Sequence, residues 1–220
     1  MKAEDVARYL QDNPGFFEDY AELLAQIYIP HPHGGRAIPI AERQILTLRE
    51  KSKMLQGKLA ELIEFGEEND AIGEKMHRLC LALFPAGDVQ GMLQALYYNL
   101  REDFAVPHAA MRVWRGPGPG AWATVGAEFA PVTDELRQYA QSLEHPYCGS
   151  GENPQVACCF GEAAAQLRSF ACMPLRDAST ACIGMLALAS EDRKRFYPEM
   201  GTLYLKRLGE LTSAALQRYV

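Results

Sequence analysis

The chain has 220 residues, a formal net charge of −6 and an isoelectric point near 5.4. This acidic balance argues against direct nucleic-acid binding and against broad attraction to anionic membranes, because both partners need a basic surface. Hydrophobic residues at 48% and charged residues at 23% are ordinary for a globular protein. The length allows one domain of roughly 100–150 residues and an extension.

Neither a signal sequence nor a membrane span is expected. The N-terminus lacks an apolar signal core, and the longest near-continuous apolar run, 181–189, is shorter than the roughly 20 residues that a bilayer span takes. The six cysteines form no Cys-x-x-Cys pair and are too sparse for a disulfide scaffold. We therefore expect a cytoplasmic protein with reduced thiols.

Residues 1–37 read as a small helical cap and a linker. Residues 3–11 predict a helix that stops at Asn13, because proline pushes the residue before it out of helical conformation. A second short helix carries aromatic residues that need a covering surface, either the start of the next helix or a second chain. These residues are Phe16, Phe17 and Tyr20. Two prolines and a glycine pair predict an extended linker over 29–35.

A heptad repeat organises residues 38–62. Seven of its eight a and d positions are apolar, which predicts a long helix with a narrow apolar seam that needs a partner helix. The eight positions are Ile38, Ala41, Ile45, Leu48, Ser52, Leu55, Leu59 and Leu62. We expect a homodimer whose contact includes Ile45, Leu48, Leu55 and Leu59.

The same helix is expected to reach Leu83. The heptad fails at Gly66, Asn69 and Gly73, so a kink or loosening is expected there, followed by a half that packs on the C-terminal module. Pro85 and Gly87 end the helix. The predicted boundaries are therefore 1–37 for the cap and linker, 38–86 for the long helix and 87–220 for the module.

The module is predicted to be α+β, with a central antiparallel sheet flanked by helices. Its expected elements are a helix at 89–104, a strand at 109–115, a turn at 116–120, a strand at 122–125, a helix at 133–144, an irregular segment at 146–166, strands at 167–175 and 181–190, and a helix at 199–219. Gly184, inside a strand, suggests a bulge or the close approach of another backbone.

No catalytic constellation is present. The chain has no Gly-x-Ser-x-Gly, Walker or His-Glu-x-x-His motif. Imidazole and thiolate groups of His145, Cys148, Cys158 and Cys159 could hold zinc or iron, which leaves a redox- or metal-dependent enzyme as an alternative. Vicinal cysteines cannot easily ligate one tetrahedral ion, however, so we expect no metal site and structural thiols.

A ligand pocket is expected between the sheet and segment 146–166, which has the length and glycine content of a cover. The first and last helices of the module are strongly amphipathic and are placed on the opposite face. The candidate ligand-binding residues are Arg112, Trp114, Tyr147, Phe160, Phe170 and Met185, with Arg112 as the one possible charge anchor. A collapsed face filled by these side chains is the alternative.

The C-terminal motifs resemble the end of a GAF domain. They are the Met173-Pro174-Leu175 strand, the Ile183-Gly184-Met185-Leu186 strand and Phe196 before the last helix. The N-terminal motifs resemble DUF484, a bacterial family of unknown function. They are Asn13-Pro14-x-Phe16-Phe17, Pro30-His31-Pro32, Glu42-Arg43-Gln44, Leu48-Arg49 and Glu68-Asn69-Asp70. This second resemblance covers nearly the whole chain.

The DUF484 resemblance implies a helical extension, a GAF-like domain and dimers, but no activity. Family genes often lie beside a tyrosine recombinase gene, which hints at a protein partner. The cyclic-nucleotide and bilin patterns of GAF domains are missing, since Gly149 follows Cys148, so the sequence names no ligand or cofactor. The expected function is a non-enzymatic, dimeric sensory or scaffold protein that relays to a partner. A pure interaction module without ligand is a further alternative.

Overall fold

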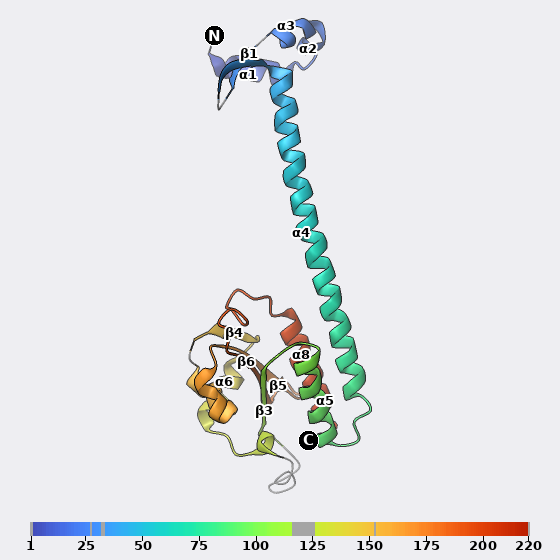
Figure 1. The fold of residues 1–220 in the computed structure, drawn as a ribbon, viewed down its shortest axis with the longest axis vertical. Coiled ribbons are helices and arrows are strands. Elements are labelled where there is room, and N and C mark those ends of the chain that lie inside the picture. Colours follow the sequence, from blue (N-terminus) through green and yellow to red (C-terminus); the bar gives the residue numbers. More distant parts are fainter. Residues whose placement is uncertain (1, 27, 32–33, 116–125, 152, 220) are drawn as a thin grey trace. The chain divides into compact units, whose positions relative to one another are not determined.

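The computed structural model describes residues 2–26, 28–31, 34–115, 126–151 and 153–219, and their side chains outside 24–42. The chain divides into two compact units, Met1–Glu68 and Asn69–Val220 (Figure 1). Helix α4 (Ile40–Leu83) contributes its first part to one unit and its last part to the other.

Three short helices open the first unit: α1 (Ala3–Asp12), α2 (Phe16–Asp19) and α3 (Ala21–Gln26). The predicted stop at Asn13 is confirmed, since its φ of −126° and ψ of 69° are non-helical and its backbone N–H donates to the Tyr9 carbonyl. The Phe16 ring stacks on Tyr20 with centroids 4.8 Å apart. Even so, Tyr9 and Tyr20 are each 56% exposed.

The expected extended linker is a paired hairpin. Strands β1 (Tyr28–His31) and β2 (Gly34–Pro39) form an antiparallel ladder in which Ile29 lies opposite Ile38. The prediction of extended backbone is right for the described residues of 29–35, and the strands are in addition paired, because proline is tolerated on strands that have a free edge. Helix α4 therefore begins at Ile40 rather than at Ile38.

Helix α4 runs without interruption to Leu83. The kink or loosening expected between Gly66 and Gly73 does not interrupt the helix. A glycine lowers helix stability by only about 1 kcal/mol relative to alanine, which a long cooperative helix can absorb. The predicted end before Pro85 is confirmed.

The second unit is built on a four-stranded antiparallel sheet. Its strands are β3 (His108–Val113), β4 (Tyr147–Ser150), β5 (Ser169–Arg176) and β6 (Cys182–Ser190), in the order β3-β6-β5-β4. The predicted turn at 116–120 and strand at 122–125 lie outside the described residues. An ideal Cβ on Gly184 would stand 2.6 Å from the Arg112 carbonyl oxygen, which confirms a close backbone approach there.

One face of the sheet is covered by α5 (Val89–Glu102), α8 (Leu203–Leu216) and the end of α4. Leu79 and Leu83 of α4 are almost fully buried in this layer. Asp88 caps α5, because its side chain accepts a 2.7 Å hydrogen bond from Gly91 N–H. The amphipathic helices of the module thus share one face, as their apolar stripes indicate.

The other face is covered by α6 (Asp134–Ser142), α7 (Pro154–Ala157) and the 3₁₀ segment η2 (Cys158–Gln166), while η1 (Ala127–Phe129) adjoins β3. The prediction that 146–166 is irregular is wrong, since this segment holds β4, α7 and η2. Four-residue elements are too short to show a period. The predicted α+β class, with helices on both faces of an antiparallel sheet, is confirmed.

Candidate functional site

The second face of the sheet gathers most of the predicted ligand-binding residues. Because side chains alternate along a strand, Arg112 and Trp114 share one face of β3, and Arg112 lies opposite Met185 of β6. Phe170 of β5 and Phe160 of η2 belong to the same layer. Three strand residues, Trp114 directly after β3 and Phe160 of the cover therefore lie on one face of the sheet. The sequence alone did not determine which face of each strand this would be.

The aromatic part of this layer is packed. Phe170 is 2% and Met185 1% exposed, and Phe160 is half-buried against them. The Phe160 and Phe170 ring centroids lie 6.2 Å apart at an interplanar angle of 53°. Such a tilted aromatic pair adds stability beyond the area it buries.

Arg112 and Trp114 are held by carbonyl groups. The Arg112 guanidinium donates to the Cys159 carbonyl at 3.0 Å and to the Met111 carbonyl at 3.1 Å. The Trp114 indole N–H donates to the Cys182 carbonyl at 3.0 Å. Arg112 thus ties the cover η2 to strand β3, and a half-buried cation sits at the junction of the two.

Tyr147 lies at the border of the site rather than inside it. It stands opposite Cys172 on the edge strand β4 and is 40% exposed. Its hydroxyl group reaches over Gly149, where an ideal Cβ would come within 2.1 Å of the hydroxyl oxygen. A side chain at position 149 would displace this ring.

The thiols of Cys148, on the first face of the sheet, and of Cys159, on the second face, are shielded from solvent. Burial raises the pKa of Cys148 to about 11 and that of Cys159 to about 12, so both stay protonated at neutral pH, whereas metal binding needs thiolates. Cys158 is exposed, and its thiol donates to the Gln155 carbonyl. Among the described residues, no group of three or more His, Cys, Asp or Glu side chains is arranged to hold a metal ion.

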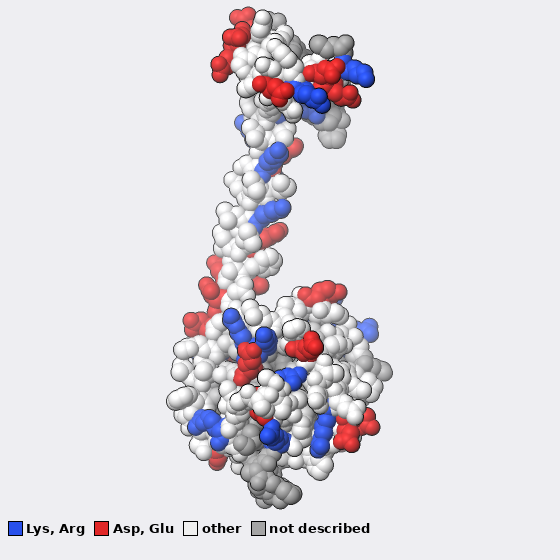
Figure 2. All heavy atoms as spheres, turned by 180° about the vertical axis from the view of Figure 1, so that it is seen from behind, with Lys and Arg blue, Asp and Glu red and all other residues white. Residues whose placement is uncertain are grey.

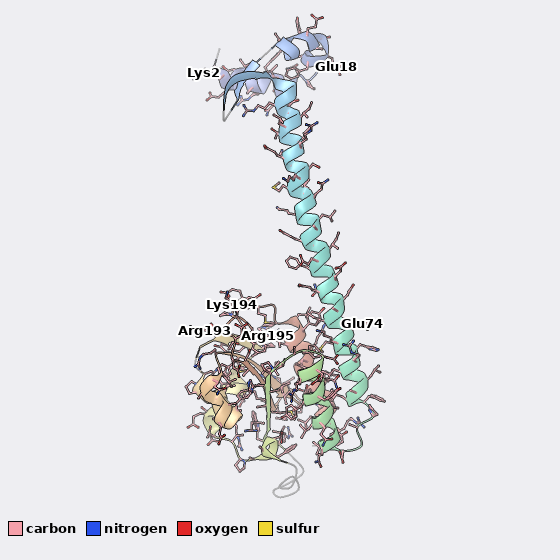
Figure 3. The ribbon with its side chains drawn as sticks, in the orientation of Figure 1. Lys2, Glu18, Glu74, Arg193, Lys194 and Arg195 are labelled. Atoms are coloured by element: carbon pink, nitrogen blue, oxygen red, sulfur yellow. The ribbon has the colours of Figure 1, made fainter. Side chains whose placement is uncertain are left out.

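Two hollows that sequence reasoning missed lie outside this layer. One, of about 320 Å³, is bounded by Met173 and Pro174 of β5 and by Lys206 and Gly209 of α8. The other, of about 670 Å³, is lined by Arg193 and Lys194 of the loop after β6, labelled in Figure 3. The only sequence signal for either was the short basic run 193–195.

The predicted dimer residues form an exposed stripe on α4. Ile45 is 50%, Leu48 64%, Leu55 62% and Leu59 58% exposed. Exposed apolar side chains repeated along one helix are typical of an interaction surface. No helix in the described part of the chain combines the length and apolarity of a membrane span.

The fold resembles that of a GAF domain. A crystal structure described as the A. aeolicus nlh2 GAF domain in an inactive state aligns with a TM-score of 0.50 and 12% identity, over 68% of this chain and 98% of that chain. A free methionine-R-sulfoxide reductase from Neisseria meningitidis, solved in complex with its substrate, aligns with a TM-score of 0.47 and 16% identity, over 66% and 88% of the two chains. No curated protein matches.

The first of these similarities supports the GAF-like description of the second unit at the level of fold. The family comparison reaches further, because it spans both units. All residues from 1 to 220 match the family described as "Protein of unknown function, DUF484". The chain therefore belongs to the DUF484 family.

Proposed function

We propose that this protein is a non-enzymatic, cytoplasmic sensory or scaffold protein that dimerises through α4 and relays the state of its GAF-like module to a partner protein. The proposal rests on one observation above all. A single helix carries an exposed apolar seam in one unit and ends inside the core of the other. Its functional parts are the cap and linker 1–37, the helix 38–86 and the module 87–220.

The docking of α4 on the module supports a mechanical link. The Tyr204 hydroxyl donates to the Asn69 carbonyl at 3.0 Å, and Arg218 donates to the Phe84 carbonyl at 2.9 Å. Both ends of α8 thus hold the last part of α4, while α8 itself packs on β5. A ligand that shifts the sheet and α8 would bias the packing of α4, and a partner could detect the difference.

The ligand site of this proposal is the second sheet face, formed by Arg112, Trp114, Tyr147, Phe160, Phe170 and Met185 under segment 146–166. Binding would move η2 outward, separate Phe160 from Phe170, and transfer Arg112 from the Cys159 carbonyl to an anionic group of the ligand. Native mass spectrometry of the purified protein tests this. A bound small molecule that is lost in Arg112→Ala supports the site.

The packing of the same face favours a second candidate, an interaction module without ligand. It predicts that native mass spectrometry finds the bare chain and that Arg112→Ala leaves partner binding unchanged. An enzyme that uses His145, Cys148, Cys158 and Cys159 predicts stoichiometric zinc or iron in the native protein, lost after Cys158→Ser and Cys159→Ser. A metal assay on both proteins therefore distinguishes the enzyme from the other two candidates.

Light scattering tests the dimer. Leu48→Asp with Leu55→Asp places charges in the seam and should yield monomers. Thr47→Asp with Met54→Asp is the matched control, since both residues lie outside the a and d positions and should leave the dimer intact. A wild-type monomer at every concentration, or a dimer that survives both seam changes, overturns the proposal.

A further inference from the structure

The first part of the cap, residues 2–23, has an exposed surface that is both apolar and acidic. None of the described side chains of residues 2–23 is buried, although Tyr9, Phe16, Phe17 and Tyr20 cluster there. The same residues include six acidic and two basic side chains. Figure 3 labels Glu18 on α2, and Figure 2 shows acidic groups gathered at this end. The partner that fits is therefore both apolar and basic.

Helix α4 has a surface that is both apolar and basic, but only in its first half, residues 43–58. Residues 43–58 contain five basic side chains and one acidic one, whereas 59–74 contain six acidic side chains and no basic one. Blue groups followed by red groups mark this change along the helix in Figure 2. The acidic cap is attracted to the basic first half of α4 and repelled by the acidic second half.

The basic groups lie beside the apolar seam. Lys51 and Lys58 occupy g positions of the heptad and Arg49 an e position, so they flank Leu48 and Leu55. No salt bridge in the described part of the chain involves these three cations. Their charges are therefore available to a docking surface.

Helix pairing alone leaves the two lysines without acidic neighbours. In a parallel pair, a g residue faces the e residue of the next heptad on the other helix. Lys51 then faces Gln56, and Lys58 faces Ile63. A two-helix seam therefore covers the leucines but leaves the basic flank for a third element.

We propose that the cap of one copy docks on the basic half of α4 of a second copy, with its aromatic cluster along the edge of the paired seam and its acidic groups on Arg49, Lys51 and Lys58. This inference rests on the dimer proposed above and adds its second contact. The chain's own helix does not supply the cover, because Tyr20 is 56% and Leu55 62% exposed within the same unit. The cap is thus an arm exchanged between two copies.

Two charge-reversal variants of the full chain test the exchange. The cap variant carries Glu18→Lys, Asp19→Lys and Glu22→Lys. The helix variant carries Arg49→Glu, Lys51→Glu and Lys58→Glu. Each should raise the dimer dissociation constant about tenfold at low salt, since three exposed ion pairs are lost. An equimolar mixture should restore wild-type affinity as a heterodimer, because each cap then meets a helix of opposite charge.

The mixing experiment separates exchange from folding back. If the cap docked on its own helix, the mixture would stay weak and only the chain carrying all six changes would recover, which overturns the inference. Glu61→Lys, Glu64→Lys and Glu67→Lys form the control in the acidic half and should not weaken the dimer. Circular dichroism of each full-chain variant reports folding, because the helices of the first unit contribute to the signal and the core of the second unit contains none of the changed residues.

Failure of this inference is distinguishable from failure of the dimer itself. If Leu48→Asp with Leu55→Asp yields monomers while all charge variants keep wild-type affinity, the α4 dimer stands and the exchanged cap is wrong. If the wild-type chain is monomeric at every concentration, the α4 dimer and the exchanged cap are both wrong.

Discussion

The two units of this chain differ in how far they bury their apolar side chains. The second unit buries two clusters, one on each face of its sheet. The first unit has no buried side chain among residues 2–23 and 43–68. In the dimer proposed above, a second copy covers the exposed apolar side chains of the first unit.

Helix α4 carries both buried and exposed leucines within one element. Leu79 is fully buried against the sheet, whereas Leu59, twenty positions earlier in the same helix, is 58% exposed. Local helix propensity is the same for both residues. The difference lies in tertiary contacts, so substitutions along this helix measure the dependence of each unit on its surroundings.

The largest expected effect comes from truncating the buried leucine. Leu79→Ala should lower the free energy of unfolding of the second unit by about 2–5 kcal/mol, because it leaves a cavity in a packed core. Leu59→Ala is the matched control and should leave that value unchanged while weakening the dimer. Urea denaturation and light scattering measure the two effects. Equal destabilisation by both changes would contradict the comparison.

Glycine substitutions should act with opposite sign in the two units. Gly184→Ala should destabilise the second unit by about 1–3 kcal/mol, because its Cβ would stand 2.6 Å from the Arg112 carbonyl. Gly57→Ala, in an open position of α4, should stabilise the helix by about 0.5–1 kcal/mol. Thermal denaturation followed by circular dichroism checks both. A stabilising Gly184→Ala would mean that the strands are not so close.

The neighbouring cysteines should respond very differently. Cys159→Ser buries a hydroxyl group and should cost about 1 kcal/mol, whereas Cys158→Ser should be nearly neutral and should remove a reactive thiol. The pKa of Cys159, raised to about 12 by burial, keeps its thiol protonated. The protonated Cys159 thiol contributes fully to stability below the ordinary thiol pKa of about 8.5. This contribution is lost as the pH rises through the pKa that Cys159 has in the folded protein.

Thiol titration checks this pair. Cys158 should react with a thiol reagent at pH 7 in the folded protein, and Cys159 only after unfolding. Rapid modification of Cys159 in the folded protein would show that η2 opens readily, and it would favour the ligand-binding candidate over the interaction module.

The smallest expected effect concerns the turn between β5 and β6. Hydrogen bonds from the Ser179 hydroxyl and from the backbone N–H groups of Ser179 and Ala181, together with Arg115, lower the pKa of Asp177. A lowered pKa contributes stability above the ordinary carboxyl pKa, which is lost as the pH falls through the folded value. Asp177→Asn should therefore melt slightly lower at pH 7, with a difference that shrinks below about pH 4. A constant difference would contradict this role.

Much of the fold was readable from local patterns. Amphipathic spacing located α5, α6 and α8, and Pro14 and Pro85 marked helix ends that the structure confirms. Gly184 indicated a bulge or a close backbone approach, and the structure shows the close approach. These signals succeed because each depends on a residue's own conformational limits or on a period sustained over many residues.

The elements that were missed are short or depend on pairing. Strand β4 and helix α7 have four residues each and show no period. The β1–β2 ladder forms between segments that read only as extended chain. Gly66 and Gly73 weaken a helix locally, and the length of α4 outweighs that weakness.

The candidate site shows the same division. The residue types of Arg112, Trp114, Phe170 and Met185 were visible in the sequence, but strand register decided that they share one face. Only the fold brought the Cys159 carbonyl to Arg112 and placed Phe160 on Phe170. By itself, the sequence determined the helices, the heptad seam, the charge change along α4 and the family. Tertiary structure decided which apolar faces are covered within one chain, because burial depends on which distant segments meet and local spacing does not encode that.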